Sequence, residues 1–310
     1  MTTTPRFFNT AGPCDPVRHY GIDPLARFPE AIALIDWQGC FVLHAPRQTG
    51  KTPTLRALAK ALTEEGRFAA PLFSCEAGEA VSDDVGEVEG ALLRQIAMTA
   101  EDDLPEALRP PPVVSAPVGV QLSSNLRAWC RSCPKPVVLF FDEIDALRDD
   151  GLRTVLRQLR ASYATRAPHA VILCGLRDVR DYRMASGGKG RLGTSSPFNI
   201  NVASTRMPSF TEAQVRELLV QHTEATGQPF SEGALERVFY YTQGQPWLTN
   251  ALAAEVVDHL GVTGEITAAH IDRAKENLVL ARAEGRGARF ELVDGSIASE
   301  IAPHPVIPRV

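Results

Sequence analysis

The sequence predicts an α/β fold in which a parallel sheet is sandwiched by helices and a small all-helical domain follows. In the first two thirds of the chain, short apolar segments with the character of strands alternate with helical segments, which is the pattern of a right-handed parallel sheet. The apolar run Val137–Phe141 is continuous, as in a strand that is buried on both faces. After Phe210 only helical periodicity is evident.

Each element of the sheet domain is predicted from its own pattern. Strands are expected at the short apolar runs Cys40–His44, Leu72–Cys75, Val137–Phe141 and Ala170–Cys174. Helices are expected where apolar residues recur at helical spacing, at Leu55–Leu62 (ended by Gly66), Leu122–Trp129 and Leu152–Tyr163. The Pro-rich segment Leu104–Val118 is expected to be a loop.

The second domain is expected to contain four helices. Apolar stripes over Val215–His222 and Ala234–Phe239 predict the first two. Pro246 fits the first turn of a third helix, and Thr267 fits the cap of a fourth. The expected divisions of the chain are an N-terminal segment, the sheet domain, the helical domain and a poorly ordered tail, at residues 1–22, 23–209, 210–282 and 283–310.

Composition and charge exclude several classes of protein. The chain is 44% hydrophobic and 22% charged, which is a globular composition, and its net charge of −5 disfavours a general nucleic-acid-binding surface. No segment approaches the roughly 18 consecutive apolar residues of a membrane span. Because Met1–Arg6 is not followed by the apolar run of a signal peptide, we expect a cytoplasmic protein that does not contact a membrane.

The strongest motif follows the first predicted strand and has the spacing of a phosphate-binding (Walker A) loop. Its sequence is Ala45-Pro46-Arg47-Gln48-Thr49-Gly50-Lys51-Thr52, with Ala45 where the first glycine is usual. In such a loop, backbone N–H groups and the start of the next helix surround a phosphate. Lys51 is expected to bridge the β- and γ-phosphates of ATP, and Thr52 to bind Mg²⁺. Pro53 falls in the first helical turn, where proline is tolerated.

A second motif ends the apolar strand Val137–Phe141. Asp142 follows the strand and is expected to hold the Mg²⁺ shell through water, as in a Walker B strand. Glu143 is then placed to polarise an attacking water as a general base. The alternative is an acidic turn that caps the next helix, and Asp145 is expected to be such a capping or surface group.

These and other segments give the chain a family resemblance. The segments are Phe8–Pro13 with His19-Tyr20, Ala45–Thr52, Phe141–Leu147, Leu156–Arg160, Cys174–Tyr182, Ser196–Ile200 and Gly244–Leu248. Over residues 7–282 the chain resembles the bacterial AAA-like (AAA+/STAND-type) P-loop ATPases that are related to archaeal-type ATPases and origin-recognition proteins. The resemblance implies a P-loop NTPase fold, a helical lid or sensor domain, and binding of ATP or ADP with Mg²⁺.

The resemblance also implies roles for residues outside the two motifs. Arg177 resembles the sensor-1 position, which reads the γ-phosphate. Pro246 resembles the GxP proline, which packs near the base and couples nucleotide state to the helical domain. His19 and Tyr20 fall where the family builds its adenine pocket. The alternatives are a surface arginine, an ordinary helix start and aromatic core packing.

Three functions stay open at this point. The first is a Mg²⁺-dependent ATPase that acts as a nucleotide-driven switch, and the second is a non-hydrolysing scaffold locked by bound nucleotide. The third is a nucleic-acid-associated ATPase, which the Arg-rich stretch 177–191 favours and the acidic net charge disfavours. The sequence leaves open a homo-oligomer or a protein partner.

Overall fold

Five parallel strands form the central sheet of the computed structural model, in the order β2-β3-β4-β1-β5. Their bounds are Cys40–His44 (β1), Leu72–Ser74 (β2), Val138–Asp142 (β3), Ala170–Gly175 (β4) and Ala203–Arg206 (β5). The predicted parallel sheet is confirmed, and the structure adds β5, which the sequence analysis missed. Because β4 pairs with both β1 and β3, it separates the strands that precede the two sequence motifs.

The structure describes most of the chain, namely residues 5–12, 14–37, 39–81, 84–163, 167–176, 203–283, 290–293 and 296–299. The predicted site residue Arg177 and the Arg-rich stretch 177–191 lie outside these residues. Within the part of the chain that is described, none of the helices combines the length and the apolar character needed to cross a membrane.

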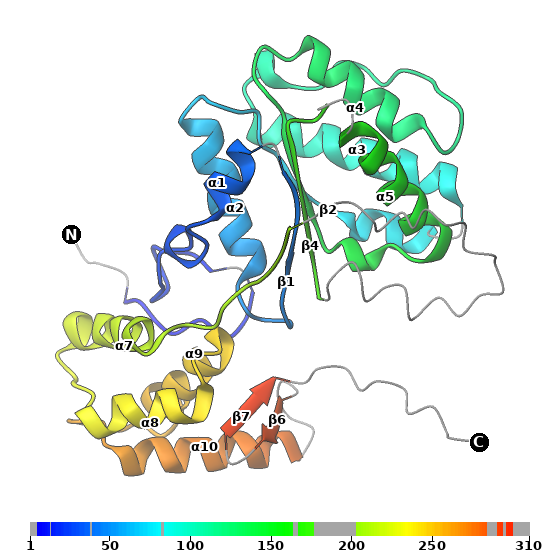
Figure 1. Cartoon of the computed structure of the whole chain (residues 1–310). Coiled ribbons are helices and arrows are strands. Elements are labelled where there is room, and N and C mark those ends of the chain that lie inside the picture. Colours follow the sequence, from blue (N-terminus) through cyan, green and yellow to red (C-terminus); the bar gives the residue numbers. More distant parts are fainter. Residues whose placement is uncertain are drawn as a thin grey trace, which may run out of the picture. The chain divides into compact units, whose positions relative to one another are not determined.

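Helices cover both faces of the sheet (Figure 1). One layer contains α1 (Ala31–Asp36) and α2 (Lys51–Glu64), and the other contains α3 (Val85–Asp103), α4 (Gln121–Ser132) and α5 (Asp149–Tyr163). Alternate residues of β3 serve the two layers, since Leu139 packs with α3, α4 and α5 whereas Phe140 packs with α1 and α2. This burial on both faces explains why the strand is a continuous apolar run.

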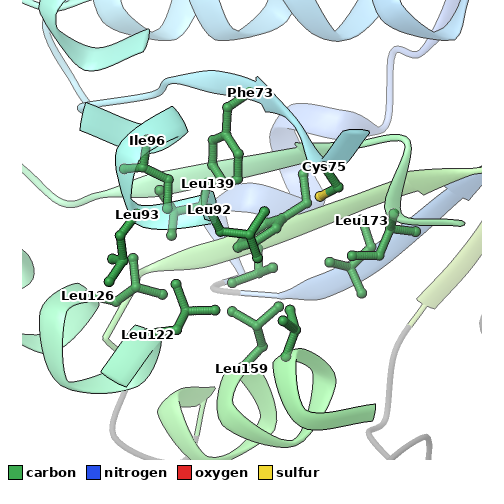
Figure 2. Packing of buried hydrophobic residues seen from close by; sticks show 14 of the residues in the cluster. Phe73, Cys75, Leu92, Leu93, Ile96, Leu122, Leu126, Leu139, Leu159 and Leu173 are labelled. Carbon is green, nitrogen blue, oxygen red and sulfur yellow. The ribbon is translucent and has the colours of Figure 1, made fainter. Parts of the chain in front are cut away.

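Figure 2 shows the core on the side of α3, α4 and α5. Phe73, Leu139 and Leu173 come from three neighbouring strands and pack against leucine and isoleucine side chains of the helices, which are Leu92, Leu93, Ile96, Leu122, Leu126 and Leu159. Burial of each such side chain stabilises the fold by about 1.5–3 kcal/mol. The sheet and its helices are therefore held together chiefly by this packing.

The segment between β2 and β3 contains a helix that the sequence analysis missed. The carboxylate of Asp84 accepts the N–H groups of Gly86 and Glu87 and so caps the start of α3. The Pro-rich loop that follows is irregular, as predicted, apart from the short turn η3 (Glu106–Leu108). The buried carboxylate of Glu89 in α3 accepts the N–H groups of Gly119 (2.7 Å) and Leu122 (3.1 Å), which joins the end of this loop to α4.

The predicted helices of the second part of the chain are confirmed. They are α7 (Glu212–Thr226), α8 (Glu232–Thr242), α9 (Pro246–Ala254), which continues into the π-helix η6 (Glu255–His259), and α10 (Ala268–Ala283). Pro246 is the first residue of α9, as its fixed φ favours. Thr267 precedes α10 as predicted, and Nδ1 of His270 accepts the N–H of Thr267 at 3.1 Å.

The tail contains a strand pair that the sequence analysis did not expect. Strands β6 (Phe290–Val293) and β7 (Ser296–Ser299) are antiparallel, and Val293 pairs with Ser296. The sequence between these paired residues is Asp-Gly, a dipeptide typical of two-residue hairpin turns. This turn signal was overlooked in the sequence analysis, and the expectation of a poorly ordered tail stays a prediction.

By their internal contacts, residues of the chain fall into two compact units. The sheet unit comprises Phe28–Ala45 and Lys51–Met207, and the helical unit comprises Met1–Arg27, Pro46–Gly50 and Pro208–Val310. The predicted N-terminal segment 1–22 thus groups with the helices, and so does the loop between β1 and α2. The domain boundaries expected at residues 22, 209 and 282 stay predictions.

We expect Leu139→Ala to lower the free energy of unfolding by about 2–5 kcal/mol, because a fully buried leucine is lost and a cavity stays behind. Met98→Ala is the control, since Met98 is 60% exposed on α3, and its effect should stay within about 0.5 kcal/mol. Urea unfolding followed by far-UV circular dichroism measures both. Equal losses for the two variants would contradict the packing of β3 against α3, α4 and α5.

Candidate functional site

The carboxyl ends of β1, β4 and β3 lie at one edge of the sheet, because these strands are parallel and in register. His44, the last residue of β1, pairs with Gly175 of β4, and Phe141 of β3 pairs with Leu173 of β4. Residues that directly follow these strands therefore lie at the same edge of the sheet. In open parallel sheets this edge is where ligands bind.

The two sequence motifs meet through Thr52 and Asp142. Thr52 lies in the first turn of α2, and its Oγ1 donates a hydrogen bond of 2.6 Å to Oδ2 of Asp142, which ends β3. The other carboxylate oxygen of Asp142 accepts the N–H of Glu143 at 3.0 Å. Asp142 is only 5% exposed, so these two donors stabilise a carboxylate that has lost most of its water. The structure thus brings together the two residues predicted to hold Mg²⁺.

Lys51 begins α2 and lies near the same carboxylates. Its Nζ donates a hydrogen bond of 2.7 Å to the carbonyl oxygen of Ala45. Burial lowers the pKa of Lys51, while the carboxylates of Asp142, Asp145 and Glu143 act in the opposite direction. The ammonium group is therefore partly desolvated and faces several acidic groups.

The loop before Lys51 contains two residues with left-handed backbone. Gln48 has φ = 62° and Gly50 has φ = 81°. Oγ1 of Thr49 donates to the carbonyl oxygen of Pro46 at 3.0 Å, which closes the loop on itself. Arg47 completes the loop, and Pro53 lies in the first turn of α2 as predicted. Whether these residues bind phosphate stays a prediction.

The loop also makes contacts within the helical unit that the sequence analysis missed. Nη1 of Arg27 donates to the carbonyl oxygen of Thr49 at 2.7 Å, and Nε2 of Gln245 lies 3.4 Å from the carbonyl oxygen of Gln48. The position of Gln245 directly before Pro246 was a usable signal, because the resemblance already pointed to that segment. The sequence contains no comparable signal for Arg27.

Glu143 has a strained backbone and a titratable neighbour. Its φ is 54°, in the left-handed region that favours glycine. Oγ of Ser74, the last residue of β2, donates to Oε2 of Glu143 at 3.2 Å. Loss of solvent, followed by a hydrogen bond to Glu76 and the charge of Glu76, raises the pKa of Glu143 above its ordinary value. Ser74 and Glu76 were missed, although Ser74 lies within the predicted strand Leu72–Cys75 and Glu76 follows it directly.

Asp145 links the turn after β3 to the end of β4, because its Oδ1 accepts the N–H of Leu176 at 3.0 Å. Cys174, near the end of β4, is buried. Burial together with the charge of Asp142 raises the pKa of its thiol well above the ordinary value. A buried neutral thiol therefore lies beside the carboxylate of Asp142.

The remaining predicted residues have other surroundings. His19 is buried, its Nδ1 accepts the N–H of Asp15 at 2.8 Å, and its ring lies edge-on to Phe7. Tyr20 packs against the rings of Phe8 and His222. Pro246 is buried at the start of α9. The roles expected for these residues in nucleotide binding, and that of Arg177, stay predictions.

Comparisons with known proteins agree with this geometry. Residues 35–182 match the family model described as AAA domain. A search of curated proteins found no match to this sequence. Among solved structures, the Walker-type ATPase of Pyrococcus abyssi is similar, with 16% sequence identity and a TM-score of 0.57 over 85% of this chain and 75% of that chain.

Two further solved structures are more distant. The Orc1 protein of Aeropyrum pernix in complex with DNA has 16% identity and a TM-score of 0.47, over 84% of this chain and 66% of that chain. The RuvB Holliday junction branch migration motor of Thermotoga maritima has 14% identity and a TM-score of 0.44, over 82% and 67%. At such scores these two likenesses do not bear on function.

The resemblance to AAA-like P-loop ATPases is thus confirmed by the family match, and the likeness to the Pyrococcus abyssi protein agrees with the predicted fold. The STAND character stays a prediction. The match to the AAA domain family model covers residues 35–182, the part of the sequence that contains both motifs.

Proposed function

We propose that this protein is a Mg²⁺-dependent ATPase that works as a nucleotide-driven switch. The observation that carries the proposal is the hydrogen bond of 2.6 Å between Thr52 and Asp142, residues from two motifs that lie 90 positions apart. A hydroxyl and a carboxylate side by side are oxygen ligands of the kind that Mg²⁺ prefers. Thr52 and Asp142 would hold the ion, which supplies positive charge to the phosphates when it is bound.

Lys51 and the preceding loop are the proposed phosphate-binding groups. The loop follows a buried strand and precedes a helix of 14 residues, which is the context that a Walker A motif requires. Residues 46–50 would present backbone N–H groups to the phosphates, and Lys51 would exchange its bond with the Ala45 carbonyl for bonds to phosphate oxygens. The start of α2 adds partial positive charge.

Glu143 is the proposed general base. Its carboxylate would accept a proton from the water that attacks the γ-phosphate, and Ser74 would orient it through the bond at 3.2 Å. A raised pKa makes this carboxylate a stronger base than an ordinary glutamate. The alternative is a scaffold that retains bound nucleotide without turnover, and the experiments below separate the two.

The switch role rests on the helical unit, to which residues 46–50 belong by their contacts. Gln245 caps α9 by accepting the N–H of Leu248 and also lies close to the Gln48 carbonyl. A change in the loop's conformation on nucleotide binding or hydrolysis would therefore alter the contact of Gln245 at the start of α9. A ligand shifts such an equilibrium only by its difference in affinity for the two states.

We expect Glu143→Gln to abolish phosphate release and to leave ATP binding intact, because it removes the proton acceptor and keeps the side-chain shape. Lys51→Ala should lose nucleotide binding itself. Glu101→Gln, which neutralises an exposed carboxylate on α3, is the control and should behave as the wild type. Turnover is measured by phosphate release and binding by mass spectrometry of the nucleotide that co-purifies.

Each alternative has its own outcome in these measurements. Phosphate release that is unchanged in Glu143→Gln would overturn the role of Glu143. Bound nucleotide in a wild type that releases no phosphate would favour the non-hydrolysing scaffold. A wild type that binds neither ATP nor ADP would overturn the proposed function as a whole.

Turnover should fall as the pH falls through the pKa of Glu143, because protonation removes the base. The hydrogen bond between the carboxyl groups of Glu76 and Glu143 favours a proton at this pair, and the charge of Glu76 adds to this effect. Glu76→Gln should therefore lower the pKa of Glu143 and move the acid limb of the kcat profile to lower pH. The control is Glu79→Gln in the same turn, whose carboxylate bonds Arg148 at 2.6 Å. Identical shifts in both variants would contradict the pairing with Glu76.

A further inference from the structure

Arg27 is a buried cation whose hydrogen bonds go to main-chain carbonyl groups. The residue is 7% exposed, and burial lowers its pKa to about 10. Nη1 donates to the carbonyl oxygen of Thr49 at 2.7 Å, and Nη2 donates to the carbonyl oxygen of Pro208 at 2.8 Å. Removing a guanidinium from water costs free energy, and its hydrogen bonds to the two carbonyl groups offset part of that cost. Because these bonds are charge-assisted and therefore strong, they hold both carbonyl groups in a fixed orientation.

The same guanidinium is joined to the start of α9 through Phe210. Its central carbon lies 4.8 Å from the centre of the Phe210 ring, within the range of a cation–π interaction. The N–H of Phe210 donates to the carbonyl oxygen of Gly244 at 2.7 Å. A Cβ atom at Gly244 would lie 1.9 Å from the carbonyl oxygen of Phe210, and φ there is +69°, so this close approach requires glycine.

Two consecutive carbonyl groups of the loop are thus in contact with side chains of the helical unit. Arg27 holds that of Thr49, and Gln245, which follows Gly244, lies 3.4 Å from that of Gln48. A Cβ atom at Gly50 would lie 2.5 Å from Nη1 of Arg27, so a larger residue there would displace the guanidinium from the loop. Arg27, Phe210, Gly244 and Gln245 therefore form one connected set around the loop.

The orientation of these carbonyl groups decides where the loop directs its N–H groups. In a planar trans peptide the C=O and the next N–H point in opposite directions. When Arg27 holds the carbonyl of Thr49, the N–H of Gly50 must point away from Arg27. The same reasoning applies to the N–H of Thr49, since Gln245 lies at the carbonyl of Gln48. These N–H groups are of the kind that bind an anion in a phosphate-binding loop.

We propose that Arg27 is a positioning residue for the phosphate-binding loop, which it orients through the Thr49 carbonyl and couples to the start of the helices through Pro208 and Phe210. This inference rests on the proposed function, because it assumes that the loop binds the phosphates of a nucleotide. Arg27 acts through the main chain of the loop and not by contact with the nucleotide. Its loss should therefore weaken phosphate binding and loosen the loop and Phe210 together.

The test compares Arg27→Met with Arg18→Met in the full-length chain. The second variant is a matched control, because the exposed Arg18 also lies over a ring, that of Phe7 at 5.7 Å, in the same N-terminal segment. We expect Arg27→Met to bind Mg-ADP about 10-fold to 100-fold more weakly, the loss typical of a buried hydrogen bond to a charged group. Arg18→Met should bind as the wild type does.

Hydrogen exchange distinguishes local positioning of the loop from a general contribution of Arg27 to stability. In Arg27→Met the amides of residues 48–50 and of Phe210 should exchange faster, while those of α10 should keep the wild-type rate. Arg27→Lys keeps the charge but has a single ammonium in place of the planar fork, so it should restore part of the affinity. If Arg27→Met does not fold, Arg27→Lys carries the test, and it must bind Mg-ADP more weakly than the wild type.

The outcomes separate this proposal from the function on which it rests. A wild type that binds no nucleotide overturns the proposed function and this inference with it. If the wild type binds Mg-ADP and both Arg27 variants bind it with the wild-type affinity, the positioning role alone is overturned. Uniformly faster exchange throughout the chain of Arg27→Met, α10 included, would also overturn it, because Arg27 would then be a general stabilising residue.

Discussion

The burial of β3 on both faces is the constraint on which the sheet edge depends. All five of its residues are buried, and Leu139 and Phe140 serve the two opposite layers. Along such a strand a carboxylate is tolerated only at the end of the apolar run, because burying it without hydrogen-bond partners is costly. Asp142 marks that point, and Thr52 and the N–H of Glu143 supply the partners. The polar side chains of the candidate site therefore lie at the end of β3, where the apolar packing of the strand stops.

The same principle explains what could be predicted from the sequence. Strands buried on both faces are continuous apolar runs, so β1, β3 and β4 were predicted within one residue of their observed ends. The two motifs attached to β1 and β3 could be placed at one edge because parallel strands share it. Burial of the whole strand thus carries information about both the fold and the site.

Elements with weaker patterns were missed for physical reasons. Strand β5 is only partly buried along its length and has the sequence Ala-Ser-Thr-Arg, which lacks an apolar run. Helix α3 has glycines and acidic residues among its apolar positions, and it is stabilised by the Asp84 cap and the buried Glu89. The contacts of Arg27 and Ser74 are long-range, and no spacing in the sequence encodes them.

The membership of loop 46–50 in the helical unit has a consequence for dissecting the protein. A linear fragment that ends at Met207 keeps every strand of the five-stranded sheet and both sequence motifs. It nevertheless lacks Pro208, Phe210 and Gln245, which lie around the loop and its arginine. Such a fragment would contain the whole Walker A sequence without these contacts of its loop, so the surroundings of the loop extend beyond the sheet unit.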